Sequence, residues 1–328
     1  MKTATSVGAL LGLALLVALV VRADIPAMVQ TWNLAGWPLL WLIPYRGLYF
    51  LMYAIGWLWL LHPVNLERRV GLGYVFWVTT VREAVDRLLP VASIGGSIVG
   101  VRLVGWRGLP VLTVSATVIA EIVVTLLVSS VFAAWGLALL VLHSGSDQEY
   151  RGLLLALLLS LPVPIVSMLL LRYGSVFSRL ERSLSPLVGV TSMSDGAAEL
   201  DRQLRRCVRR ARALSGVGAL QLVAFVLGTF EVWFALKLFG HPVGVAAALI
   251  LESMTLAVRH VAFIIPAGLG VQEAGLVLFG HALGLSSDLA LCLSMAKRMR
   301  EVLCGLPSLL SWQWMEARRA RGVAGTAC

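Results

Sequence analysis

Charged side chains recur inside segments of this sequence that are otherwise apolar. An ionised side chain at the centre of a membrane helix costs about 2.5–3.5 kcal/mol, so such residues are either paired inside the protein or serve a function. Eight residues fall in this class: Glu121, Glu231, Glu252, Arg259, Glu273, Lys297, Arg298 and Glu301.

One apolar stretch is interrupted at residues 265–275, which read IPAGLGVQEAG and include Glu273. Proline and glycine end a helix, and non-helical backbone persists at membrane depth only inside protein or beside a wet cavity. The half-helix that follows would present free N–H groups and a positive dipole end to a phosphate or carboxylate. Gly268, Gly270 and Gly275 would let backbone or ligand approach closely. The stretch therefore predicts a polar binding site.

Spacing along a helix offers a plainer explanation for part of this charge, because residues four apart share a face and neutralise each other. The candidate pairs are Lys297 with Glu301, Arg82 with Asp86 and Glu83 with Arg87, and Glu252 lies two turns from Arg259 on one face. We favour a functional role for Arg259, Glu273 and Arg298, since each lies in or faces the broken stretch. Glu231 lies near the end of a predicted span, where it would snorkel.

The composition places these residues in a membrane. The chain has 328 residues, 59% of them hydrophobic and 13% charged, with a mean hydropathy of +0.88. Globular domains carry about 25% charged residues. The net charge is +10, but the basic residues lie between apolar spans, which indicates membrane topology and anionic headgroups rather than nucleic acid. Four cysteines are too few for a disulfide framework, and we expect free thiols.

Apolar runs predict about six full spans and two broken segments in an all-α polytopic membrane protein. The first run carries features of both a signal peptide and a retained span, and we favour the span. The predicted spans are residues 6–22, 39–61, 110–142, 152–171, 214–240 and 287–313, and the broken segments are about 72–104 and 243–284.

Arginine placement predicts the orientation. Residues 172–213 hold nine arginines against four acids, and further arginines mark residues 62–71 and the C-terminal tail. The positive-inside rule places these segments in the cytoplasm. Successive spans then cross the membrane in alternating directions only under two conditions. Residues 72–104 must enter and leave the membrane on the cytoplasmic side, and residues 243–284 must enter and leave it on the outer side. Both broken segments are therefore predicted to be re-entrant.

The chain divides into two halves around the basic connector. We expect residues 1–171 to form an N-terminal membrane half, 172–213 the connector, and 214–328 a C-terminal membrane half with a short basic tail. Within the connector, Leu200, Leu204, Val208 and Ala211 share a helical face. That face predicts either an amphipathic helix lying on anionic lipid or the solvated start of the next span.

A weak internal repeat relates the two halves. Residues 88–100, LLPVASIGGSIVG, align with 264–276, IIPAGLGVQEAGL, and at the same offset Ser97 meets Glu273 and Glu121 meets Lys297. The topology gives the two halves opposite orientations. Inverted repeats with broken helices mark the substrate site in many transporters.

Signatures of soluble enzymes are missing from the sequence. It has no Gly-x-Ser-x-Gly, no phosphate loop and no cluster of metal-ligand residues, and its five histidines lie far apart. We therefore expect no cofactor and no metal, and transport rather than catalysis.

The motifs VREAVDRLLPVASIGGSIVGVRLV (81–104) and IPAGLGVQEAGLVLFGHALGLSSDLALCLSMAKRMREVLCGLPSLLSWQ (265–313) resemble a flippase-like family, that of the lysylphosphatidylglycerol synthase transmembrane region. The chain is most similar to its hopanoid-biosynthesis-associated branch, and the resemblance covers nearly the whole sequence. It implies a bacterial inner-membrane protein that handles a polar lipid, and the arginines of the tail place its C-terminus in the cytoplasm. The family pattern falls on Arg82, Glu83, Leu89, Pro90, Gly95, Gly96, Pro266, Gly268, Gly270, Gln272, Glu273, Gly275, Lys297 and Arg298.

One position departs from the family pattern, because Ser97 stands where the family often has a glutamate. A role that needs two matched acids is therefore in doubt. The soluble aminoacyl-transferase domain of the full synthases is absent from this sequence, so lipid lysylation is not expected.

The leading interpretation is a lipid translocase whose substrate-binding residues contact a polar or anionic headgroup. Two alternatives stay open: a membrane enzyme that modifies a headgroup, with Glu273 as base, and a non-catalytic partner of hopanoid biosynthesis enzymes. The sequence leaves the substrate, the coupling ion and the oligomeric state open. The predicted substrate-binding residues are Arg82, Arg87, Arg259, Gly268, Gly270, Gln272, Glu273, Lys297 and Arg298.

Overall fold

The computed structural model describes residues 25–89, 95–144, 162–174, 177–179, 194–261, 265 and 268–325, and within these ranges it contains helices and no strand. The predicted first span, 6–22, lies outside the described residues, as do Pro90, Pro266 and the first half of the span 152–171. The prediction of an all-α fold is confirmed for the described part of the chain.

Within the described ranges, three helices are long and apolar enough to cross a membrane. They are η1 with α3 (Trp37–Trp41 and Leu42–Leu61), α6 (Val111–Ser144) and α11 (Ala211–Leu238), which agree with three predicted spans. Lipid cannot hydrogen-bond a backbone, so a long apolar run must satisfy its own N–H and C=O groups as a helix. Shorter helices are α2 (Ile25–Ala35), η2 (His62–Val64), α8 (Pro162–Tyr173) and α10 (Ser194–Val208).

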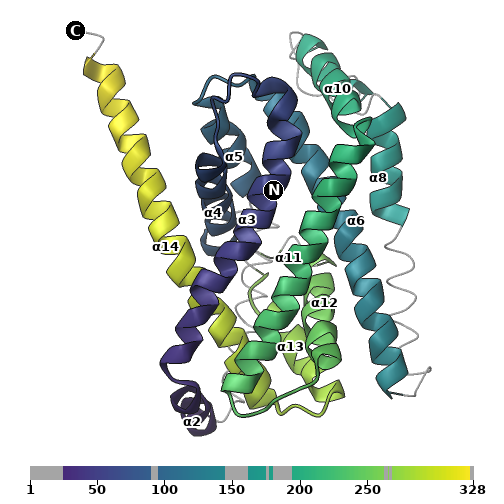
Figure 1. Cartoon of the computed structure of the whole chain (residues 1–328), viewed down its shortest axis with the longest axis vertical. Coiled ribbons are helices and arrows are strands. Elements are labelled where there is room, and N and C mark those ends of the chain that lie inside the picture. The colour runs from purple at the N-terminus through teal and green to yellow at the C-terminus, as the bar shows by residue number, and fades with distance from the viewer. Residues whose placement is uncertain are drawn as a thin grey trace.

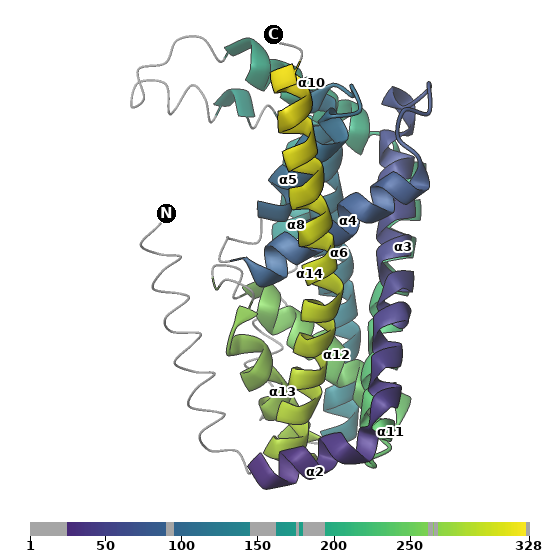
Figure 2. The same cartoon turned by 90° about the vertical axis from the view of Figure 1, so that its left-hand side faces the viewer.

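The last helix, α14 (Ser287–Gly325), has 39 residues and runs most of the length of the bundle (Figures 1 and 2). At 1.5 Å per residue it is about 58 Å long, more than a bilayer with its headgroups. The helix therefore continues beyond the predicted span 287–313. The extension is held by side chains, since Glu316 pairs with Arg102 and Arg319 lies 5.0 Å from the centre of the Trp106 ring.

Two pairs of short helices occupy the predicted re-entrant segments. The first pair is α4 (Leu72–Leu88) with α5 (Gly95–Gly105), and the second is α12 (Val245–Val261) with α13 (Val271–Ala282). Helices of 11 to 17 residues reach about 17–26 Å, short of a 30 Å hydrocarbon core. Figure 2 shows α4 running obliquely to mid-height within the half of the bundle that carries the C-terminus, whereas α12 and α13 lie in the opposite half.

The two halves repeat each other with the offset predicted from the aligned motifs. At that offset the start of α5 at Gly95 falls on the start of α13 at Val271, and the start of α6 at Val111 falls on the start of α14 at Ser287. Contacts follow the same symmetry: α4 packs on α14 of the other half, and α12 packs on α6 of the other half. One hydrophobic cluster surrounds α4 and α5, and a second surrounds α12 and α13. The broken pairs therefore hold the two halves together.

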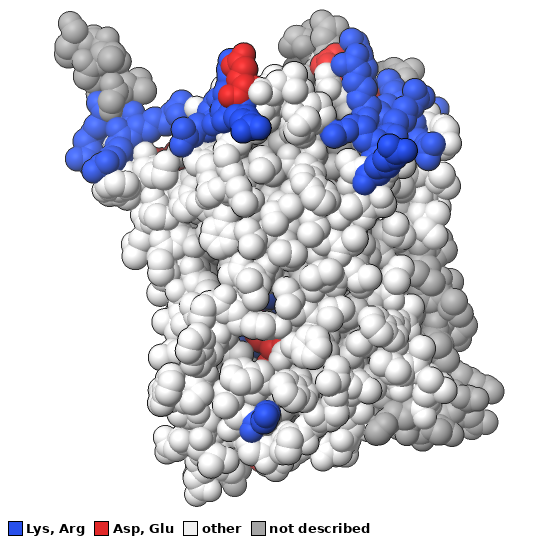
Figure 3. Space-filling model, in the orientation of Figure 1, with Lys and Arg blue, Asp and Glu red and all other residues white. Residues whose placement is uncertain are grey.

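Basic side chains are concentrated at one end of the molecule. Figure 3 shows lysine and arginine gathered at the end that carries α10 and the C-terminus, above an almost uniformly apolar face. A hollow at mid-height on this face exposes charged side chains. The apolar band fits a lipid environment, and the hollow leads toward charge at membrane depth.

Helix α10 is amphipathic, but its apolar face does not lie on lipid. Leu204 and Val208 are buried, and α10 packs on α6 and α8. Asp201 ties it to the preceding segment, because its carboxylate accepts hydrogen bonds from the Phe177 and Ser178 N–H groups at 3.1 and 2.9 Å. The helix ends at Val208, so Ala211 belongs to α11 instead. The structure thus differs from both alternatives for this face.

Candidate functional site

The charged centre of the molecule is Glu301 on α14, whose side chain is 5% exposed. Its carboxylate lies 3.3 Å from the guanidinium of Arg298 and 3.9 Å from those of Arg87, Arg259 and Arg300. These arginines come from α4, α12 and α14 itself. Three helices that are distant in sequence therefore converge on one carboxylate.

A glycine lets α4 and α14 approach each other here. A Cβ atom added at Gly305 would lie 2.5 Å from Cδ1 of Leu88, well inside van der Waals contact. Gly305 lies one turn beyond Glu301 on α14. The close packing brings the last turn of α4, with Arg87, against Glu301.

Further pairs extend this centre. Glu83 accepts a hydrogen bond from Arg46 of α3 at 3.1 Å and one from Arg87 at 2.9 Å, and Arg300 pairs with Glu231 of α11. We call the whole set the central network. It consists of Arg46, Glu83, Arg87, Glu231, Arg259, Glu273, Arg298, Arg300 and Glu301.

The central network carries surplus positive charge. Counted over the described residues with every group ionised, its five arginines outnumber its four glutamates by one. Five of these side chains are buried, whereas those of Glu83, Arg87, Arg259 and Arg298 stay 18–26% exposed, three arginines against one glutamate. A buried charge without a counterion is costly. The network is therefore suited to receive an anionic group at its accessible edge.

The broken stretch 265–275 forms a ring of hydrogen bonds at one side of the network. Arg259 donates to Gln272 at 3.0 Å, Gln272 donates to Ser294 at 3.3 Å, and Ser294 donates to Glu273 at 3.0 Å. Arg298 donates to Glu273 at 3.1 Å and to the carbonyl oxygen of Gly268 at 3.2 Å. This ring joins the end of α12, the start of α13 and α14.

Two of the predicted glycines are required by the backbone. Gly268 and Gly270 have φ angles of +59° and +72°, which side chains other than glycine rarely adopt. Gly268 also lies against Arg259, since an added Cβ would be 3.4 Å from its Nε. An added Cβ at Gly275 would make only ordinary contacts with α12, at 3.8 Å or more, so packing within the protein does not require glycine there.

Helix N-termini in both broken pairs have protein carboxylates nearby. Asp86 accepts a hydrogen bond from the Gly96 N–H at 2.8 Å in the first turn of α5. Glu273 lies in the first turn of α13, where a negative charge complements the helix dipole. An incoming anion would therefore meet the arginines rather than bare helix ends.

Arg82 lies apart from the central network. It pairs with Glu121 of α6 at 2.9 Å, rather than with Asp86, and its guanidinium lies 4.6 Å from the centre of the Trp57 ring. Lys297 pairs with Glu252 of α12, so the predicted pairing with Glu301 is wrong. Gly228 of α11 makes room for this pair, because an added Cβ would lie 2.7 Å from the Glu252 carboxylate.

Of the predicted site residues, Arg87, Arg259, Gly268, Gln272, Glu273 and Arg298 are brought together, Gly270 caps the adjoining helix, and Arg82 and Lys297 hold separate pairs. The predicted pair of Glu83 and Arg87 is confirmed. Glu231 is 3% exposed and paired with Arg300, so the prediction that it snorkels is wrong.

Sequence reasoning missed Arg46, Arg300 and Ser294. Arg46 had a signal, since it is a single arginine inside the apolar run 39–61. Arg300 stands two residues after Arg298 in the last span and could have been grouped with it. Ser294 had no signal in the sequence, because serine is common in membrane helices and its hydrogen bonds depend on the fold.

The network encloses little free space. A cavity of about 10 Å³ lies among Arg46, Glu83, Arg87, Arg300 and Glu301, which is about the space that one water molecule needs. A lipid headgroup would have to bind at the partly exposed edge or displace a helix. No group of three metal-ligating side chains is found among the described residues.

Comparison with known proteins agrees with the geometry at the level of a family. Residues 6–306 match a family model described as the lysylphosphatidylglycerol synthase TM region. No curated protein and no solved structure matches the chain.

Proposed function

The chain belongs to the family of the lysylphosphatidylglycerol synthase transmembrane region, and from this premise we propose that it translocates a polar lipid across the bacterial inner membrane. The observation that carries the proposal is the surplus positive charge of the central network at membrane depth. A phosphate-bearing headgroup would supply the missing negative charge. Its acyl chains would stay in the surrounding lipid.

The arrangement of the broken pairs supports movement of a headgroup rather than simple storage. The pairs lie in opposite halves of the bundle, and residues from both contribute to the network through Arg87 and Arg259. Each pair packs on a long helix of the other half, so a tilt of one half would open the network toward one end. Transporters built from inverted repeats alternate access in this way.

Within this proposal, the basic end faces the cytoplasm. Arginine-rich α10 and the C-terminal end of α14 lie there together (Figure 3), in line with the positive-inside rule. The motif resemblance to the hopanoid-associated branch suggests a hopanoid-linked or other polar lipid as substrate. The charge of the network favours a headgroup with at least one negative charge.

A leaflet-exchange assay tests the proposal. The full chain is reconstituted into vesicles that contain a fluorescent phosphatidylglycerol, and a membrane-impermeant reductant quenches the outer leaflet. We expect the wild-type chain to quench more than half of the probe. Arg259→Gln with Arg298→Gln, which removes the surplus positive charge at the exposed edge, should return quenching to the protein-free level. Lys237→Gln is the matched control, because Lys237 is exposed and lies outside the network.

Headgroup analysis of the same vesicles separates the alternatives. Exchange without chemical change supports translocation. A new headgroup product would identify a membrane enzyme instead. Absence of both, for hopanoid-type lipids as well as for phosphatidylglycerol, would contradict translocation and favour a non-catalytic partner.

A further inference from the structure

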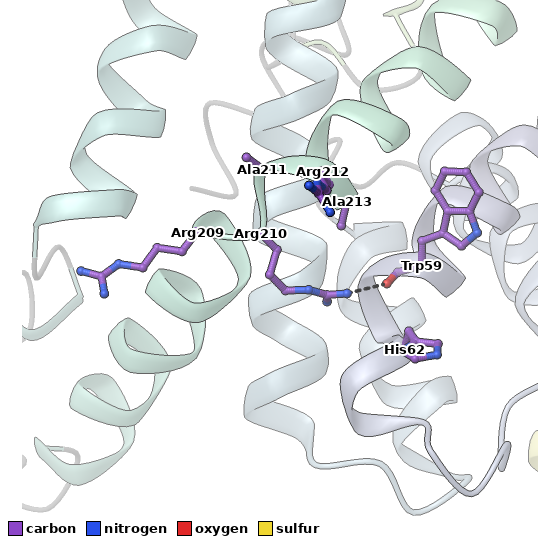
Figure 4. A pocket seen from close by; sticks show the side chains of 7 residues that line it. All are labelled: Trp59, His62, Arg209, Arg210, Ala211, Arg212 and Ala213. Carbon is purple, nitrogen blue, oxygen red and sulfur yellow. Dashed lines mark hydrogen bonds between the residues drawn. The ribbon is translucent and has the colours of Figure 1, made fainter.

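A second basic site lies at the surface, away from the central network. A pocket of about 640 Å³ opens between the end of α3 and the junction of α10 with α11. Trp59 and His62 line one side, and residues 209–213 line the other (Figure 4). We call it the junction pocket. Its volume is in the range of small-molecule sites.

Three arginines give the junction pocket its charge. The guanidinium of Arg210 donates to the carbonyl oxygens of Leu60 and Trp59 at 3.2 and 3.4 Å, which fixes it at the C-terminal end of α3. Figure 4 shows Arg209 extending to the opposite side of the junction. Among the described residues, no carboxylate forms an ion pair with Arg209, Arg210 or Arg212. Three positive charges thus lack a counterion in the described part of the protein.

Three helix ends meet at the junction pocket. The C-terminal ends of α3 and α10 are negative and lie next to Arg210 and Arg209, and the N-terminal end of α11 is positive. The first turn of α11 starts at Ala211 and lines the pocket, so the positive end of a 28-residue helix points toward the arginines. Helix N-termini bind phosphate groups readily when basic side chains lie beside them. The pocket therefore favours a phosphate over a neutral headgroup.

An apolar track leads away from the pocket along α11. Gly216, Val223 and Phe230 follow Arg212 at intervals of four and seven residues, which places them on one helical face. Val223 and Phe230 are 48% and 42% exposed, as is fitting for a lipid-facing surface. The Trp59 ring lies against Gly216, where an added Cβ would be 2.7 Å from it, and stays 46% exposed. Tryptophan is typical of the membrane–water interface.

We propose that the junction pocket binds the phosphate group of an anionic phospholipid, with its acyl chains along the exposed face of α11. The pocket supplies the charge, and the apolar track begins at its edge. A free phosphate ion would use the arginines but would gain nothing from the track. This site goes beyond lipid translocation, since it shares no residue with the central network.

Native mass spectrometry of the full chain in detergent tests the proposal. The chain is titrated with phosphatidylglycerol and with phosphatidylcholine of the same acyl chains. We expect tighter binding of phosphatidylglycerol than of phosphatidylcholine. Arg209→Gln with Arg212→Gln should weaken the binding about 25-fold, from about fivefold for each arginine near an anionic surface. Arg318→Gln with Arg321→Gln is the matched control. It removes two exposed arginines from the same end of the molecule and should leave the affinity unchanged.

Three results would overturn the assignment. Equal affinity for the two lipids would show that the pocket has no preference for an anionic headgroup. An equal loss of affinity in both double variants would show that the lipid responds to the overall charge of this end of the protein and not to the pocket. Displacement of the lipid by millimolar inorganic phosphate would identify a site for a free anion. The variant side chains are exposed, so an unchanged melting temperature verifies that both proteins are folded.

Discussion

Lys297 on α14 pairs with Glu252 on α12 at the repeat position where Glu121 on α6 pairs with Arg82 on α4. Glu121 and Lys297 occupy the same position in their long helices, counted from the first residue of α6 and of α14. The charges are reversed between the halves, but each pair joins the first helix of a broken pair to a long helix that follows it. The repeat therefore places an ion pair at the same position of each long helix, although the partners, Arg82 and Glu252, do not occupy equivalent positions in α4 and α12.

The first prediction is that Lys297 and Glu252 form one structural unit. Their side chains are 9% and 16% exposed, so removing one partner leaves a buried charge. We expect Lys297→Met or Glu252→Gln to lower the free energy of unfolding by about 3–5 kcal/mol. The double variant should regain most of that loss. Thermal and denaturant unfolding of the purified chain in detergent measures both effects.

The control for this double-mutant cycle combines Lys297→Met with Glu273→Gln. Among the described residues, Glu273 forms its ion pair with Arg298 and not with Lys297. Those two changes should add, with no recovery. Recovery in the control, or its absence in the Lys297–Glu252 pair, would contradict the assigned partners.

The second prediction separates charge from structure at Glu273. Its Oε1 atom accepts the hydrogen bonds of Ser294 and Arg298, whereas Oε2 has no hydrogen-bond partner among the described residues. In Glu273→Gln an amide oxygen can take the Oε1 place and keep both bonds. We expect the melting temperature to fall only slightly, because Arg298 also retains Glu301. Lipid exchange should be lost, because the network gains a second uncompensated charge.

The exchange assay and a melting curve on the same protein preparation measure this prediction. Gln272→Glu is a useful companion variant. It keeps a side-chain oxygen that accepts the hydrogen bond of Arg259, and it adds a negative charge next to Glu273. A stable Glu273→Gln protein with full exchange would remove Glu273 from the mechanism.

The elements of the fold could be predicted from the sequence because the bilayer restricts them. Apolar runs became α3, α6 and α11, and charge counting placed the two broken segments at opposite ends. The extra length of α14 could not be seen in the same way. Its C-terminal part is polar, and its contacts are with Arg102 and Trp106, which lie far earlier in the sequence.

Part of the cluster could be anticipated from the sequence, which indicated Arg87, Arg259 and Arg298 but missed Arg46 and Arg300, and the pairs between helices could not be predicted. Helical spacing identifies partners on the same helix, as for Glu83 and Arg87. The remaining pairs cross between helices: Arg300 meets Glu231, and Lys297 meets Glu252. Which helices touch is decided by packing of the two halves, and no local pattern in the sequence encodes it.

The third prediction concerns Gly96, where α5 meets α4. An added Cβ would collide with the backbone oxygen of Arg82 and lie 2.6 Å from the Asp86 carboxylate. Gly96→Ala should therefore lower the free energy of unfolding by about 1–3 kcal/mol through overpacking. Gly73→Ala on the same helix as Arg82 is the control, because nothing lies within 4 Å of its added Cβ. That variant should be neutral or gain up to about 1 kcal/mol.

Unfolding in detergent checks both glycine variants. Equal stability of Gly96→Ala and Gly73→Ala would show that α4 and α5 are not packed as closely as described. A loss confined to Gly96→Ala would support the close contact that places Arg82 and Asp86.

The last prediction is the orientation of the chain in the membrane. Asn33 on α2 and Gly196 on α10 are exposed and lie at opposite ends of the bundle (Figure 1). Cysteines are introduced at each position in a chain whose four native cysteines are replaced by alanine, and intact cells are treated with an impermeant maleimide. Because the arginines of α10 favour the cytoplasm, Asn33→Cys should react in intact cells and Gly196→Cys only after permeabilisation. Labelling of Gly196→Cys from outside would reverse the orientation, and it would place the junction pocket in the outer leaflet, where its lipid would have to be sought.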